Sequence, residues 1–273
     1  MRFFPFLFLG LGCDVLQEKI DEIEELTNGF VAGGVYMGIE EFDSPYFDIS
    51  DTEFGNTAQL TLYLAAAEFS NELSANPLSR ADVLFSGGGI ADLVIPESSD
   101  PGAYMATSGD GLAYIEGSEA TLDIIHSQVP RQLSIEAPLA PVFSLPESHT
   151  LGNNISIDLT GQQFYEALVV VVRVDTGEIT YEKRPTDVES LYEFAHPEGV
   201  LMSDDPEFIT TLEIPAQAFP NNNIYVVAIA GIRSSDRDQM VDVNPVMSSF
   251  IAGKFNIEEF CVPSCEDLFE VPQ

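Results

Sequence analysis

The chain has 273 residues, of which 45 are Asp or Glu and only 10 are Lys or Arg, so its formal net charge is −35 at pH 7. This charge argues against nucleic acid as a partner, because affinity for a phosphate backbone comes mainly from cationic contacts. Hydrophobic residues make up 45% of the chain, which is enough for two domains that each bury a core.

The first residues predict a secretory signal peptide over residues 1–12. Arg2 precedes an apolar run that ends in small residues, and Cys13 follows directly after Gly12. The run is too short for a membrane-spanning helix, which needs about twenty apolar residues. A buried strand or helix with an incidental thiol is the alternative that this pattern leaves open.

A short amphipathic helix is predicted over residues 13–29, as a tether between the N-terminus and the folded body. Gly29 is placed to end this helix. Four apolar residues recur at helical spacing: Leu16, Ile20, Ile23 and Leu26.

Residues 30–137 are predicted to form a first β-sandwich, because short β-type runs alternate there with turn residues. Residues 65–73 fit a helix as well as a strand. The three glycines at 87–89 predict a hairpin turn, since the Lys and Ser or Thr of a phosphate-binding loop do not follow them. The predicted strands are 31–39, 59–69, 81–85, 90–96, 103–108, 120–126 and 132–137.

A second sandwich is predicted over residues 138–257, and it starts with a stiff, extended joint from Pro138 to Pro141 that suits a domain boundary. The run 168–174 is apolar on both faces for most of its length and predicts a central strand, while residues 187–194 predict a brief helix. Seven strands is the count of an immunoglobulin-like sandwich. The predicted strands are 142–146, 154–159, 166–174, 178–183, 208–215, 223–233 and 247–255.

The remaining residues, 258–273, are predicted to form a C-terminal tail with a disulfide between Cys261 and Cys265. These cysteines are close enough to pair, and an exported compartment would let them oxidise. Zinc binding is disfavoured, because zinc needs four ligands and no further Cys pair or His accompanies them.

Several of these segments resemble the uncharacterised two-domain surface lipoproteins of some Gram-negative bacteria. The start resembles a lipobox, although Gly10 stands where that motif favours Leu, and the resemblance implies that Cys13 is the lipid attachment site. Residues 102–124 are similar to a transthyretin-like module, and residues 167–194 with 248–255 to an immunoglobulin-like one. The resemblance implies an all-β fold of two tandem sandwiches and a lipid-anchored location in the bacterial cell envelope, on the outer membrane and facing the surface or the periplasm. It brings no catalytic residue.

No catalytic motif is found in the sequence. G-x-S-x-G and H-E-x-x-H are both missing, and the three histidines, His126, His149 and His196, are far apart in the sequence. We expect no enzyme and no required cofactor.

Calcium is the one cofactor that the sequence suggests, because calcium takes six to eight oxygen ligands and acidic residues gather in one loop. Arg237 lies inside the same stretch and opposes a cation, so a solvated acidic loop is the alternative. The candidate ligands are Asp236, Asp238, Asp242 and Asn244. A second acidic stretch, residues 40–51, offers Glu41, Asp43, Asp48 and Asp51.

We therefore predict a non-enzymatic, lipid-anchored envelope protein with a binding or structural role. Its partners would be the membrane, through the N-terminal lipid, and a protein or glycan, since β-sandwich loops supply recognition surfaces. The alternative is a hydrolase of envelope or extracellular polymers that uses carboxylates the sequence does not single out.

Overall fold

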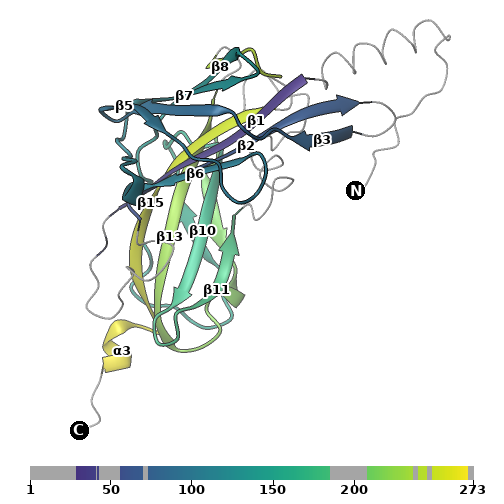
Figure 1. Cartoon of the computed structure of the whole chain (residues 1–273). Coiled ribbons are helices and arrows are strands. Elements are labelled where there is room, and N and C mark those ends of the chain that lie inside the picture. Colours follow the sequence, from purple (N-terminus) through teal and green to yellow (C-terminus); the bar gives the residue numbers. More distant parts are fainter. Residues whose placement is uncertain are drawn as a thin grey trace, which may run out of the picture.

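The computed structural model describes residues 29–40, 42, 56–69, 73–184, 208–235, 239–244 and 248–269. The predicted signal peptide, Cys13, the helix preceding Gly29 and the helix at 187–194 lie outside these residues. The regular secondary structure of the described residues is almost all strand, with only three short helices (Figure 1), which confirms the all-β class.

One eight-stranded sheet takes strands from both halves of the sequence (Figure 1). Its order is β11-β10-β13-β15-β1-β2-β3, and β6 also pairs with β2. The strands are β1 (Gly29–Ile39), β2 (Ala58–Phe69), β3 (Leu73–Pro77), β6 (Ala103–Thr107), β10 (Glu166–Arg173), β11 (Glu178–Lys183), β13 (Asn223–Ser234) and β15 (Ser249–Val262).

The first and last strands lie side by side at the centre of this sheet, where purple β1 runs beside yellow β15 in Figure 1. They pair in parallel, from Gly33 opposite Ser249 to Ile39 opposite Phe255. On its other side β15 pairs antiparallel with β13 over twelve consecutive positions. The sheet therefore depends on residues from the two extremes of the described chain.

Side chains alternate along β15 without a break, and this divides the sheet into two faces. Phe250 and Ala252 belong to a first hydrophobic cluster, and Phe260 and Val262 to a second, on the same face. We call this the Phe250 face. At the intervening positions of β15, Ile251, Phe255 and Ile257 belong to a third cluster on the opposite face.

A five-stranded sheet covers the first cluster, in the order β14-β8-β7-β4-β5. Phe85 and Leu122, both 0% exposed, point from it toward the large sheet. The turn between its strands β4 and β5 carries Gly88 and Gly89 at positive φ, as the sequence predicted. Its strands are β4 (Asp82–Gly87), β5 (Ile90–Val94), β7 (Glu119–His126), β8 (Val129–Glu136) and β14 (Met240–Val241).

A smaller layer covers the second cluster. It consists of the two-stranded sheet of β9 (Ile155–Asp158) and β12 (Thr211–Ile214), with Phe143 and Phe219 packed beside it. Short helices are η2 (Ser108–Asp110), η3 (Ala216–Ala218) and α3 (Cys265–Phe269).

The two predicted halves therefore have separate hydrophobic clusters on the Phe250 face but share one sheet. The predicted boundary after residue 137 falls just past β8, but the first cluster also takes Val243, Phe250 and Ala252 from beyond this boundary. Two independent sandwiches would each keep their own strands, whereas β1 and β15 pair across this boundary. The tail predicted from residue 258 begins inside β15, which continues to Val262.

Most predicted strands are present. Residues 65–69, for which a helix was the alternative, continue β2 as a strand. The strands β3 and β14 were not predicted. Residues 142–146 form no strand, because side chains rather than a neighbouring strand bind their backbone.

Candidate functional site: a pocket at the waist

The Phe250 face changes from apolar to polar between its two hydrophobic clusters. Lys254, Asn256 and Glu258 project there from β15, at alternate positions between Ala252 and Phe260. Polar groups at the centre of a sheet face need partners. Asn256 and Glu258 find them in the irregular segment 137–146, which we call the joint, and Lys254 pairs with Glu116.

Side chains hold the joint by its backbone. Asn256 donates from Nδ2 to the carbonyl oxygen of Pro141 at 3.0 Å, and Glu258 accepts the N–H of Leu145 at 3.3 Å. Burial raises the pKa of Glu258, and the Leu145 N–H opposes this in part. Gln162 binds Val142 twice, accepting its N–H at 2.8 Å and donating to its carbonyl at 2.7 Å.

Glu116 ties the joint to the large sheet. Its Oε1 accepts the N–H of Ala140 at 3.1 Å and lies 3.0 Å from Nζ of Lys254. Burial alone would raise the pKa of Glu116, but the bonds from Lys254 and Ala140 outweigh it and hold the pKa below its ordinary value.

Tyr114 fixes the start of the joint by donating its hydroxyl to the carbonyl of Pro138 at 2.9 Å. Its ring lies against β1 at Gly38, where an added Cβ would be 2.5 Å from the ring. Only a glycine leaves room for the ring at this position, and burial raises the pKa of Tyr114.

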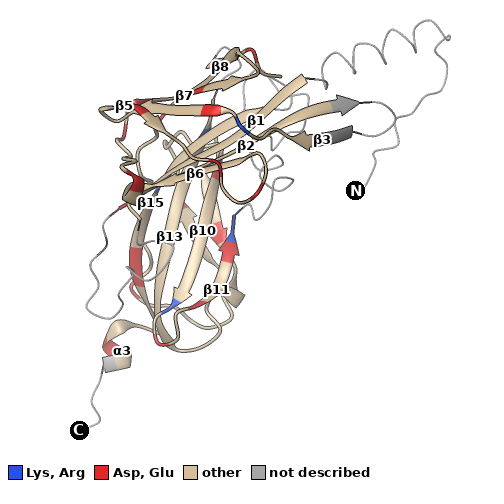
Figure 2. Cartoon of the chain, in the orientation of Figure 1, with Lys and Arg blue, Asp and Glu red and all other residues tan. Residues whose placement is uncertain are grey.

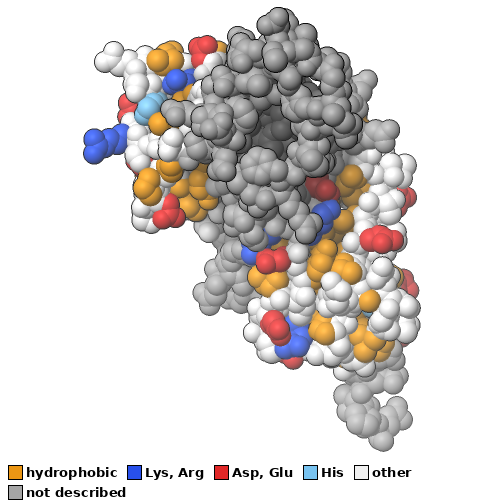
Figure 3. Space-filling view, turned by 90° about the vertical axis from the view of Figure 1, so that its right-hand side faces the viewer, with side chains coloured by type: hydrophobic (Ala, Val, Ile, Leu, Met, Phe, Trp, Pro, Cys, Tyr) orange, Lys and Arg blue, Asp and Glu red, His pale blue; other side chains and the backbone are white. Residues whose placement is uncertain are grey.

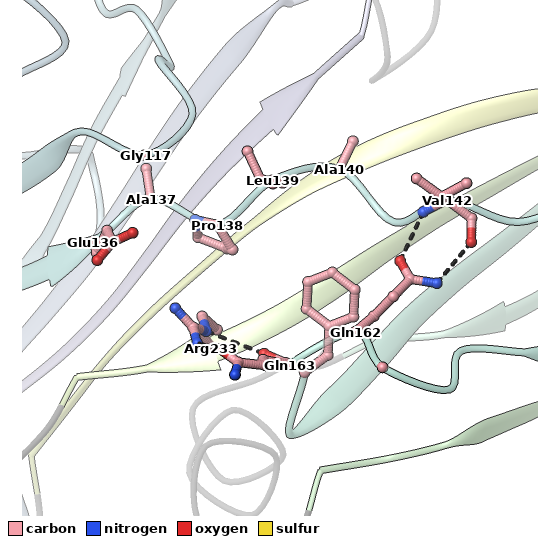
Figure 4. Close-up of a pocket in the computed structure, with 12 residues that line it drawn as sticks. Gly117, Glu136, Ala137, Pro138, Leu139, Ala140, Val142, Gln162, Gln163 and Arg233 are labelled. Atoms are coloured by element: carbon pink, nitrogen blue, oxygen red, sulfur yellow. Dashed lines mark hydrogen bonds between the residues drawn. The ribbon is translucent and has the colours of Figure 1, made fainter.

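A pocket of about 460 Å³ lies where the joint passes over the large sheet (Figure 4). We call it the waist pocket. Small-molecule sites usually have volumes of about 300–1,000 Å³. Its walls are mainly apolar, and its lining residues are Gly117, Glu136, Ala137, Pro138, Leu139, Ala140, Val142, Gly161, Gln162, Gln163, Phe164 and Arg233.

Phe164 is the largest buried side chain of this lining, with 5% of its surface exposed. Its ring packs on β13 at Gly231, where an added Cβ would overlap the ring. The glycine in an otherwise apolar central strand therefore sets the depth at which Phe164 lies.

Arg233 contributes a positive charge to the pocket. Its Nε donates to the carbonyl of Gln163 at 3.0 Å and its Nη2 to Oε1 of the same residue at 2.7 Å (Figure 4). No carboxylate of the described residues forms an ion pair with Arg233. Four other described cations do form such pairs: Arg173, Lys183, Arg184 and Lys254.

Glu136 contributes a negative charge, at the end of β8. It is exposed, and it lies at the opposite end of the pocket from Gln162 and Val142 (Figure 4). Although Glu136 and Arg233 line one pocket, they form no ion pair within 4.0 Å of each other. The pocket therefore offers one charge of each sign that the described residues do not neutralise.

The rim of the pocket exposes large apolar side chains. Val142 is 77% exposed and Leu139 is 62% exposed, and of the described large hydrophobic residues only Val94 is comparable, at 66%. On the face drawn in Figure 3, apolar side chains of the described residues are scattered among charged ones. Exposed apolar groups beside a pocket are typical of a binding site.

The predicted disulfide is present, since Cys261 and Cys265 are bonded at the end of β15. His149 lies near it, 8% exposed, against Phe219 and Phe260, and its Nε2 is buried without a described partner. Burial lowers the pKa of His149.

The predicted calcium loop is only partly described, because Asp236 and Asp238 lie outside the described residues. Asn244 is buried, and the carbonyl of Asp242 accepts a hydrogen bond from Arg131 at 3.1 Å, so a positive charge already lies there. Among the described residues, no three His, Cys, Asp or Glu side chains are grouped closely enough to hold a metal ion. Described Asp and Glu residues are spread over both halves (Figure 2).

No protein-family model matches this chain, and comparison with curated proteins gives no significant match. Within the part of the chain that the structure describes, no helix has the length and hydrophobicity needed to cross a membrane.

Sequence reasoning did not find the waist pocket. Its charged residues, Glu136 and Arg233, are separated by almost a hundred positions and stand in no motif. The available signal was the proline-containing joint, which was interpreted only as a domain boundary.

Proposed function

We propose that the protein is a non-enzymatic, lipid-anchored component of a bacterial cell envelope that binds a protein or glycan partner through the waist pocket. The observation that carries the binding role is the pocket itself, with its apolar walls, its exposed rim and Arg233, which no carboxylate of the described residues pairs with. The lipid anchor at Cys13 and the envelope location rest on the sequence of residues 1–13 and on the resemblance to two-domain surface lipoproteins. As part of this proposal, each half forms one sandwich, transthyretin-like in the first and immunoglobulin-like in the second, with the large sheet as a layer of both.

Native mass spectrometry of the full-length protein, purified from its own cell envelope, tests the binding role. We expect a fraction of the protein to carry an added mass. That mass should be lost in Leu139→Trp, because the larger indole at the rim fills the pocket. The substitution should leave the fold intact, because Leu139 is exposed. An added mass that Leu139→Trp retains contradicts binding in the waist pocket.

Protease shaving of intact cells tests the location, with Cys13→Ala as the matched control. The lipid anchor predicts that the wild type stays with the membrane fraction and that Cys13→Ala is released. Loss of the C-terminal half from intact cells would place it on the surface, and protection until the outer membrane is opened would place it in the periplasm. Release of both proteins alike contradicts the anchor.

A further inference from the structure

The charges of the waist pocket narrow the chemistry of its ligand. Arg233 keeps N–H groups beyond the two that bind Gln163, since a guanidinium has five. A guanidinium binds a carboxylate better than it binds an amide, because the bonds are charge-assisted. Glu136, exposed at the same pocket, can accept hydrogen bonds from an ammonium group.

The apolar part of the pocket lies between these charges and the Gln162–Val142 pair. Phe164, Leu139 and Pro138 supply its surface. A ligand that contacts the whole lining therefore carries one negative and one positive group and has an apolar body.

The net charge of the protein favours such a ligand over a simple anion. A chain with a formal charge of −35 repels anions at long range. A zwitterion has no net charge, so it approaches without that repulsion and still offers a carboxylate to Arg233.

From these observations we infer that the waist pocket binds an apolar zwitterion, a free amino acid or a short peptide with both ends free. Arg233 binds the carboxylate, Glu136 binds the ammonium group, and the apolar side chain lies against Phe164 and Leu139. This inference rests on the proposed binding role of the pocket and assigns it a small ligand in place of a whole protein or a glycan.

Calorimetric titration of the full-length protein with matched probes tests it. The probes are L-leucine, the dipeptide Ala-Leu, its N-acetyl form, its C-terminal amide and the doubly blocked form. L-Leucine and Ala-Leu distinguish an amino acid from a peptide as the preferred zwitterion. The variants are Arg233→Gln and Glu136→Gln.

The control variant is Arg173→Gln, which makes the same charge change at the other end of the sheet. Arg173 stands opposite Tyr225, eight positions from Arg233 along β13, or roughly 26 Å at about 3.3 Å per residue.

We expect amidation to weaken binding to the wild type about ten- to a hundredfold, the range for a hydrogen-bonded charge. Amidation should have little effect on Arg233→Gln, acetylation should have little effect on Glu136→Gln, and Arg173→Gln should bind as the wild type does.

Two results would overturn the inference. One is equal binding of the doubly blocked dipeptide and the free dipeptide; the other is no binding of either leucine or Ala-Leu at millimolar concentration. If an added mass that depends on Leu139 is still seen under either result, the pocket binds another class of ligand and only the zwitterion is excluded. If that mass is also missing, the proposed binding role fails with it.

Discussion

The two halves of the molecule cover the same face of the large sheet in different ways. Over the first hydrophobic cluster lies a five-stranded sheet, in which neighbouring strands satisfy one another's backbone groups. Over the second lies a two-stranded sheet, and between the two the joint is held by side chains of Glu116, Asn256 and Gln162. A segment whose backbone N–H and C=O groups form hydrogen bonds with side chains does not have to lie at the regular distance between neighbouring strands. The waist pocket occurs at this irregular part of the layer.

The largest effect we predict concerns whether the halves unfold together. Phe85→Ala in the first cluster and Phe219→Ala in the second should each lower the free energy of unfolding by about 3–5 kcal/mol, because both rings are buried. Since β15 contributes side chains to both clusters, calorimetry should show one transition that both variants shift. Val94→Ala, at an exposed position, is the control. Two transitions, each moved by only one variant, would make the halves independent domains.

Gly231→Ala should disturb the irregular layer more than its small size suggests. The new methyl group overlaps the ring of Phe164, so we expect a loss of about 1–3 kcal/mol in stability, as for an overpacked core, together with a reshaped pocket. Chemical denaturation measures the loss. Adding Phe164→Leu should recover part of it, and wild-type stability in Gly231→Ala alone would show that the ring does not need this glycine.

Glu116→Gln tests how much one side chain contributes to holding the joint. We expect a loss of about 1 kcal/mol at neutral pH, because Glu116 is partly exposed and its pair with Lys254 is screened. The pKa of Glu116 is lowered in the folded protein, so its contribution is present above the ordinary glutamate value of 4.5 and is lost as the pH falls below it. The difference between the two proteins in urea denaturation should therefore shrink in acid.

Glu182→Gln, which breaks an exposed pair with Arg184, is the matched control and should change stability by less than about 0.5 kcal/mol. An equal loss in both variants would mean that the joint gains nothing from Glu116.

The smallest effect concerns His149 in the second cluster. Its pKa is lowered by burial, so the unfolded chain binds a proton that the folded protein does not, and stability falls as the pH drops below the ordinary value of 6.5. We expect His149→Phe to reduce the decrease in Tm between pH 7 and pH 5. An unchanged decrease would show that His149 is not its source.

The sequence predicted the strands well because their signal is local. Alternating or continuous apolar runs bounded by turn residues located nearly every strand, including the buried β10. It also predicted the Cys261–Cys265 disulfide, from the short spacing of the two cysteines and the expected export of the protein. The shared sheet was not predictable in this way, because the pairing of β1 with β15 joins residues more than two hundred positions apart.

The pocket escaped prediction for a related reason. Lys254, Asn256 and Glu258 look in sequence like the exposed side of an amphipathic strand, the pattern of a half-solvated sheet. Their interactions with the joint and with Glu116 exist only in the folded protein, where the joint passes over β15. Arg233 carries no local signal either, since its environment is made by Gln163, seventy positions earlier.

The position of β15 also determines when the sheet can be completed. Synthesis delivers the chain from its N-terminus, so β1 and β13 are both made before Ser249 appears. Until then each of these strands has an unpaired edge at the centre of the future sheet, and such edges are prone to pair with other chains. A chain truncated before residue 249 retains most of its strands but lacks the one that joins them. The edges of β1 and β13 thus stay open to other chains until β15, the last strand of the described residues, has been synthesised.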